Sequence, residues 1–166
     1  RRSFIKKGAA LASIPFITTG LFARAIINKR LTEDPFKLNY APHFGMFKHS
    51  AGENLLDQLQ FMHDQGFRSL EDNGMKGRTI DVQTKIAKKM TKLDMDMGVF
   101  VGHKIYWREP NLTSGDKSLQ DEFVKNIKES VEVAKRVNAT WMTVVPGHVD
   151  LKKEMAYQTV NVVEAL

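Results

Sequence analysis

Histidine side chains stand at the ends of two apolar runs of this chain. The runs VFVGH and VVPGH both finish in a Gly-His pair, at His103 and His148. Glycine allows a sharp turn or a close approach to a ligand, and an imidazole can contact a hydroxyl group, accept a proton or bind a metal. We therefore predict that His103 and His148 contact a substrate in a shared pocket. The alternative is that each imidazole only forms hydrogen bonds with a neighbouring loop.

Two further apolar runs also end in polar side chains. Glu71 and Asp72 end the run FRSLED, and His43 ends the run KLNYAPH. A carboxylate at the end of a buried strand needs a partner. Arg68 is three positions from Glu71, so on a strand the two side chains point to opposite faces and do not pair. We interpret Glu71 and His43 as pocket residues.

A long loop follows His103 and carries side chains suited to ligand contact. Tyr106, Trp107 and Arg108 are consecutive and form an amphipathic cluster that can cover a polyol or a hydroxy acid. We predict that Trp107 contacts the substrate. The alternative is a loop that is held in place by its own aromatic side chains.

Several motifs and one residue type are absent. The chain has no GxGxxG after its first strand, no GxxxxGK followed by Ser or Thr, no HExxH and no GxSxG. Dinucleotide-binding, P-loop, zincin and serine-hydrolase functions therefore lack support. The chain also has no cysteine, which excludes disulfides, thiolate metal sites and a cysteine nucleophile. A metal would have to be bound by histidine and carboxylate side chains.

Alternating strands and helices position these candidates. The predicted strands span residues 37–43, 67–74, 97–103 and 139–148. The predicted helices begin at a capping box of Ser50 and Glu53, near Thr79, at Ser118 and at a cap formed by Asp150. Their apolar faces have helical spacing and consist of Leu55, Leu59 and Met62, then Val82, Ile86, Met90 and Leu93, then Phe123, Ile127, Val131 and Ala134, and last Ala156, Val160 and Val163.

Four consecutive βα units predict a parallel α/β fold. Strand runs such as VFV and MTVV lack polar alternation, as in parallel strands that are covered on both faces. An open doubly wound sheet and a (βα)8 TIM barrel both fit this pattern, and a complete barrel takes about 250 residues. We expect the first four βα units of a barrel, with the NVVEAL run at the end of the sequence belonging to an interrupted helix. Unpaired strand edges in such a half should cause aggregation or a homodimer.

The first 25 residues are typical of an export signal. They begin RRSFIKK, continue with an uncharged stretch and end in the small-residue pattern Ala-Arg-Ala. The pattern RRSFIK resembles the twin-arginine motif, and the stretch is shorter than the roughly 20 residues of a spanning helix. We predict a twin-arginine signal peptide over residues 1–25, a linker over 26–36 and a barrel domain over 37–166. The partner would be the twin-arginine export machinery and the location the periplasm, without a stable membrane span.

This signal accounts for most of the net charge. The chain has 25 Lys and Arg, 19 Asp and Glu and a formal charge of +6. Residues 1–25 hold five of the basic residues and none of the acidic ones, so the remainder has 20 basic and 19 acidic side chains, a net charge of +1. No basic surface is left to favour nucleic acid as a partner.

The body of the chain resembles a known enzyme family. The runs LLDQLQFMHDQGFRSLEDNG, KKMTKLDMDMGVFVGH and FVKNIKESVEVAKRVNATWMTVVPGHVD, followed by YQTVNVVEAL, are similar to the first half of hydroxypyruvate isomerases. These belong to the xylose isomerase-like barrels, also called sugar phosphate isomerases/epimerases. The resemblance covers roughly residues 37–166. The loop after His103 is longer than the Asn-Pro-containing loop of the cytoplasmic members, and an export signal is also unlike them.

The resemblance implies an activity and a cofactor. A divalent metal ion, Mg, Mn or Zn, would bridge two oxygens of a small sugar or hydroxy-keto acid, and two glutamates would move a proton between adjacent carbons through an enediolate. Hydroxypyruvate would give tartronate semialdehyde, although the long loop and the export signal favour a sugar or cyclitol. In the family the catalytic glutamates and the metal ligands lie on strands five to eight. No catalytic or metal-binding residue is therefore predicted within this chain, which we expect to be inactive alone.

Two other functions remain open from the residues. An exported barrel could bind a carbohydrate through the aromatic loop without catalysis. An apurinic endonuclease of the same barrel superfamily would require binding to DNA, against which the net charge of +1 and the export signal argue.

Overall fold

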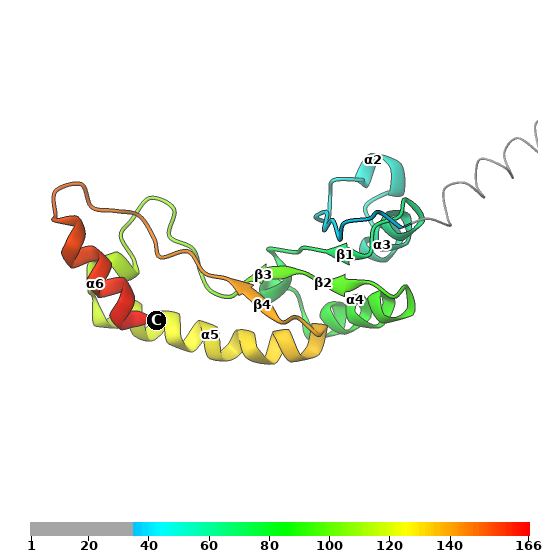
Figure 1. Cartoon of the computed structure of the whole chain (residues 1–166). Coiled ribbons are helices and arrows are strands. Elements are labelled where there is room, and N and C mark those ends of the chain that lie inside the picture. Colours follow the sequence, from blue (N-terminus) through cyan, green and yellow to red (C-terminus); the bar gives the residue numbers. More distant parts are fainter. Residues whose placement is uncertain (1–34) are drawn as a thin grey trace, which may run out of the picture. The chain divides into compact units, whose positions relative to one another are not determined.

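The structure is a computed structural model that describes residues 35–166 (Figure 1). The predicted signal peptide and all but the last two residues of the predicted linker lie outside the described residues. The described part is a mixed α/β unit.

Parallel pairs of short strands form the centre of this unit. The strand β1 (Ser69–Leu70) pairs with β2 (Asp96–Met97), and β3 (Val99–Val101) pairs with β4 (Trp141–Thr143). Only Gly98 separates β2 from β3, so residues 96–101 form one extended segment, which runs between β1 and β4 in Figure 1.

A fourth extended segment lies beside β1. His43 and Glu71 form a parallel bridge, and the Glu71 amide donates to the carbonyl oxygen of Pro42 at 3.1 Å. The four extended segments therefore neighbour one another in the order in which they occur in the sequence, and all are parallel. The four predicted strands lie where the structure has extended segments, but the observed segments are shorter than predicted. Residues 37–41 are not paired, and β4 ends at Thr143 rather than at His148.

The helices follow the extended segments as the sequence predicts. The four longest are α3 (Leu55–Asp64), α4 (Ile80–Lys92), α5 (Lys117–Val137) and α6 (Met155–Ala165). Shorter turns are α2 (Lys48–Ala51), η1 (Met75–Gly77) and η2 (Leu112–Ser114). The helix α4 begins where the sequence predicts, and the side chain of Thr79 caps it by accepting a bond from the Val82 amide. Across residues 35–166, no helix is long and apolar enough to cross a lipid bilayer.

Two predicted helix starts are wrong. Ser50 lies inside α2, and the side chain of Asn54 caps α3 by accepting from the amide of Leu56 at 2.8 Å. Asp150 lies in a turn before α6, where the side chain of Gln158 both accepts from its amide and donates to its carbonyl oxygen. The side chain of Asn54 thus serves the free amides at the start of α3, whereas α6 begins after Glu154 without a side-chain cap.

The main core lies between the extended segments and α3, α4 and α5. Its side chains are almost fully buried, and each contributes on the order of 1.5–3 kcal/mol to folding through the removal of apolar surface from water. The cluster consists of Leu59, Met62, Leu70, Met75, Ile86, Met90, Leu93, Met95, Met97, Phe100, Val133 and Val137.

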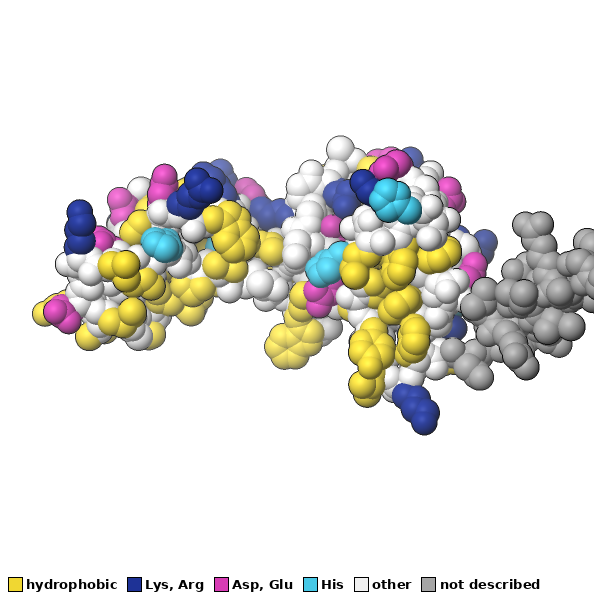
Figure 2. All heavy atoms as spheres, turned by 90° about the horizontal axis from the view of Figure 1, so that it is seen from above, with side chains coloured by type: hydrophobic (Ala, Val, Ile, Leu, Met, Phe, Trp, Pro, Cys, Tyr) yellow, Lys and Arg dark blue, Asp and Glu magenta, His cyan; other side chains and the backbone are white. Residues whose placement is uncertain are grey.

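Four predicted core residues, Val131, Ala156, Val160 and Val163, lie at the surface instead. Val131 on α5 is 38% exposed, and Ser130 takes the buried position, where its hydroxyl donates to the carbonyl oxygen of Gly102. Val160 and Val163 on α6 are 51% and 69% exposed, because α6 packs against η2 rather than against a strand. Figure 2 shows groups of hydrophobic side chains among the charged ones on the visible face.

Candidate functional site

A hollow lies at the carboxyl ends of β3 and β4. It has a volume of about 450 Å³ and is lined by Asn73, Val101, His103, Ile105, Trp107, Thr143 and Val145. A neighbouring hollow of about 420 Å³ shares Asn73, Val101 and His103 and adds Lys76, Lys104 and Asn126. In parallel α/β proteins ligands bind at this end of the strands. The structure therefore brings His103 and Trp107 together at the expected edge, as the sequence predicts.

His103 is buried and uses both ring nitrogens. Its Nδ1 lies 2.8 Å from the carbonyl oxygen of Lys104, and its Nε2 accepts from the Val145 amide at 2.9 Å. Because the carbonyl can only accept, these contacts fit a neutral ring with its proton on Nδ1. Burial lowers the pKa of His103 below its usual value, against a smaller opposing effect of the Lys104 contact. This geometry favours the structural alternative, since neither ring nitrogen is left for a ligand.

Glu71 and His43 form a pair on the two preceding extended segments. Glu71 Oε2 lies 3.3 Å from His43 Nε2, with 34% and 44% of the two side chains exposed. Gly98 makes room for this carboxylate, because a Cβ there would lie 3.3 Å from Glu71 Cγ. A carboxylate beside an imidazole can bind hydroxyl groups or hold a proton. The pair does not line the hollow beside His103.

Asp72 and Arg68 have structural partners. Asp72 is 5% exposed and accepts two bonds from Arg78, from Nε at 2.5 Å and from Nη2 at 3.1 Å, and a third from the Gly74 amide. Arg68 donates to the carbonyl oxygens of His63 and Phe67. Arg68 thus contacts backbone carbonyl groups and Glu71 contacts His43, while Asp72 fixes the turn after β1.

His148 is not brought to the hollow. Its side chain is exposed, while its amide donates to the carbonyl oxygen of Glu109 at 3.2 Å and its own carbonyl accepts from the Thr113 hydroxyl at 2.7 Å. Residue 148 therefore joins two loops through its backbone. The shared pocket predicted for His103 and His148 is not formed in the described structure.

The two Gly-His pairs use their glycines differently. Gly147 has a φ of +101°, and a Cβ there would lie 2.7 Å from the backbone nitrogen of Asn111. Gly102 has an ordinary backbone, but a Cβ there would lie 3.1 Å from Ile127 on α5 and 3.3 Å from Met142 Sδ on β4. One glycine therefore permits two loops to approach and the other permits a helix to pack on the sheet.

The structure of the loop that carries Tyr106 and Trp107 agrees with both alternatives, a loop held in place by an aromatic side chain and a loop that can contact a ligand. The Tyr106 hydroxyl donates to Glu122 Oε2 at 2.6 Å, and Lys104 Nζ lies 4.4 Å from the centre of the Tyr106 ring. Tyr106 therefore anchors the loop to α5. Trp107 is 73% exposed at the edge of the hollow, in a position where its indole can cover a ligand.

Sequence reasoning missed several side chains that line these hollows. Asn73, Lys76 and Thr143 were not singled out. Asn73 lies directly after Glu71 and Asp72 at the polar end of a predicted strand, which is a signal that could have found it. Lys76 reaches the rim from η1, where its Nζ contacts Glu129 at 2.9 Å and the carbonyl oxygen of Asn126 at 3.3 Å, and no spacing in the sequence indicates that contact.

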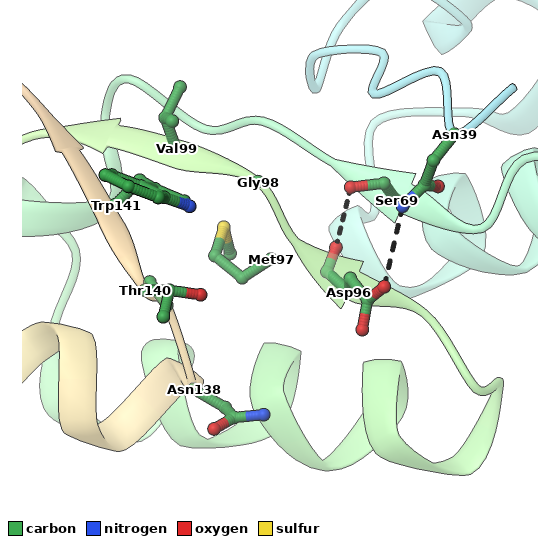
Figure 3. Close-up of a pocket in the computed structure, with 10 residues that line it drawn as sticks. Asn39, Ser69, Asp96, Met97, Gly98, Val99, Asn138, Thr140 and Trp141 are labelled. Carbon is green, nitrogen blue, oxygen red and sulfur yellow. Dashed lines mark hydrogen bonds between the residues drawn. The ribbon is translucent and has the colours of Figure 1, made fainter.

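Another hollow of about 430 Å³ lies at the opposite, amino ends of the strands (Figure 3). Its lining includes Ser69, whose hydroxyl donates to the Asp96 carbonyl oxygen at 3.1 Å, and Asn39, which lies 3.5 Å from the Asp96 carboxylate. Trp141 lies on its far side. Its position at the amino ends makes it the less favoured site in a parallel sheet.

The divalent metal that the family resemblance implies does not fit the described residues as a complete site. Within residues 35–166, no three His, Asp or Glu side chains lie close enough to share an ion. His43 and Glu71 offer two ligands at most.

The comparisons with known proteins give no family. No family model, no curated protein and no solved structure matches this chain.

Proposed function

We propose that this chain forms the ligand-binding half of a (βα)8 barrel that isomerises or epimerises a small sugar or hydroxy-keto acid. The order of the extended segments carries this proposal. They neighbour one another in sequence order and are all parallel, as successive strands of a barrel are. Open doubly wound sheets instead reverse the strand order at a switch point.

The lining of the carboxyl-end hollow supports binding of a polar ligand. The lining of the hollow includes the exposed indole of Trp107, the amide of Asn73 and the hydroxyl of Thr143. An aromatic face with a few polar groups suits the CH faces and hydroxyl groups of a sugar. The Glu71–His43 pair would bind a hydroxyl group of the same ligand or of a larger one.

Proton transfer is not assigned to residues of this chain. Backbone groups occupy both ring nitrogens of His103, and Asp72 is bound by Arg78. The metal and the two glutamates implied by the resemblance remain expectations for strands five to eight. Export through the twin-arginine pathway to the periplasm is part of the same proposal.

Binding is tested with the fluorescence of Trp107. The chain has two tryptophans, so the Trp141→Phe variant reports from Trp107 alone. Ketoses, cyclitols and hydroxypyruvate are titrated, and we expect a saturable change for at least one of them that Asn73→Ala and Thr143→Val weaken. Lys85→Met, on the exposed side of α4, is the control. No saturable change with any of these ligands would contradict a rim site.

Activity is tested on the gene product that contains all eight βα units. Isomerisation of hydroxypyruvate and of ketoses is measured with and without a chelator, and we expect activity that the chelator removes. Chelator-insensitive isomerisation would contradict the metal-assisted reaction. Saturable binding without any turnover would support the carbohydrate-binding alternative, which the exposure of Trp107 also favours.

A further inference from the structure

The long loop (residues 104–116) and the segment after β4 (residues 144–148) are joined by a set of hydrogen bonds. Three of them use only backbone groups and hydroxyls. These are His148 N to Glu109 O at 3.2 Å, Leu112 N to Pro146 O at 3.0 Å and Thr113 Oγ1 to His148 O at 2.7 Å. The fourth joins Val145 to His103, the residue directly before the long loop, whose Nε2 accepts from the Val145 amide at 2.9 Å. It is the one contact of the set whose acceptor can be protonated.

Protonation of His103 would replace its hydrogen bond from the Val145 amide with a repulsion between two N–H groups. The neutral ring donates from Nδ1 to the Lys104 carbonyl and accepts at Nε2. A second proton on Nε2 would point at the N–H of Val145, and two donors cannot share a hydrogen bond. The ring would also carry a charge while 4% exposed and packed edge-on against Phe123, with the ring centres 5.1 Å apart. The closed arrangement therefore requires the neutral ring.

The charged groups around the ring are already paired with one another. On its own segment, Lys104 contacts the hydroxyl of Tyr106 and lies 3.8 Å from Glu122 of α5. On η1, Lys76 contacts Glu129 of α5. The facing residues of β4 and the segment after it are Thr143 and Val145, which do not titrate. No carboxylate in the described residues lies within salt-bridge distance of His103 to stabilise its charged form.

We propose that His103 is a pH-sensitive latch that holds residues 144–148 against the long loop and releases them when the pH falls. The latch does not depend on the proposed function. Its consequence for ligands does, because Trp107 and Val145 both line the carboxyl-end hollow. Release would open a wall of that hollow.

The direction of the pH dependence follows from linkage. Burial holds the pKa of His103 below its ordinary value of 6.5 in the closed form, while the open form exposes the ring and restores that value. The open form therefore binds a proton first as the pH falls below about 6.5, and closure weakens until the closed form also becomes protonated. Within this window the opening equilibrium constant rises by up to about tenfold for each unit of pH, the limit for one proton.

Hydrogen exchange of the Val145 amide, followed by NMR between pH 5 and 8, tests the latch. The rates are corrected for the pH dependence of chemical exchange to give the opening constant. His103→Gln is the matched variant, because a glutamine oxygen can accept from Val145 without titrating. His148→Gln is the control, since that side chain is exposed. The amides of Leu70 and Phe100 report on the core, and the ring signals of His103 give its own titration.

We expect the Val145 opening constant of the wild type and of His148→Gln to rise as the pH falls below 6.5, and that of His103→Gln to change less than about twofold. Equal pH dependence in wild type and His103→Gln would overturn the latch. So would a ring titration at or above 6.5, or opening of Leu70 and Phe100 in step with Val145. If His103→Gln does not fold, the ring titration and the wild-type exchange rates decide between these outcomes alone.

Discussion

Replacing Gly147 with alanine should destabilise the described unit more than the same replacement at Gly45. Both glycines have a positive φ, but Gly45 has open space around it. Gly147 has a φ of +101°, a conformation that costs a residue with a Cβ about 1–2 kcal/mol. The new Cβ would also lie 2.7 Å from both the backbone nitrogen and the Cβ of Asn111. Backbone cannot give way as a flexible side chain does, and such overpacking adds about 1–3 kcal/mol. The total is about 2–5 kcal/mol.

Gly45 offers a control that separates these two costs. Its φ is +89°, and a Cβ there would meet nothing within 4 Å. Gly45→Ala should therefore cost only the backbone contribution, about 1–2 kcal/mol. The free energies of unfolding of both variants and the wild type are measured in urea. Equal losses for Gly147→Ala and Gly45→Ala would show that residues 110–111 and 147 do not approach closely, which would refute the docking of the two loops.

Three further variants and one control variant test the core and the turn after β1. Phe100→Ala removes a fully buried side chain and should cost about 3–5 kcal/mol in urea unfolding; a loss below 1 kcal/mol would contradict its central position. Asp72→Asn should cost about 1.5–3 kcal/mol because Arg78 loses a charged acceptor, whereas Asp81→Asn, in an exposed pair with Lys85, should leave the melting temperature unchanged. Ser130→Ala removes the buried bond to Gly102 and should cost about 1 kcal/mol, and an unchanged melting temperature would show that this bond is not formed.

The helices could be predicted because their signals are local. The spacing of Ile86, Met90 and Leu93 and the cap at Thr79 lie within one stretch of sequence, and α4 follows them closely. The surface position of Val160 could not be found in this way. Its helical spacing is regular, but the partner of α6 is a loop rather than a strand, and that choice depends on tertiary contacts.

The chemistry of the candidate site was less predictable than its position. The end of the strand at His103 indicated the edge of the sheet at which the hollow lies. The role of the ring is set by the amide of Val145, which is 42 residues away, and the partner of Asp72 is set by the turn that brings back Arg78. The sequence shows which side chains can accept or donate. The sequence does not show which groups form hydrogen bonds with these side chains in the folded protein.

Chemical shift mapping tests the central claim, that ligands bind at the carboxyl ends of these parallel segments, most directly. A sugar or hydroxy-keto acid that binds in the fluorescence titration is added to labelled protein. The account predicts that the perturbed amides cluster around Asn73, Thr143 and Trp107. Perturbations centred instead on Ser69, Asp96 and Trp141, at the amino ends, would contradict it.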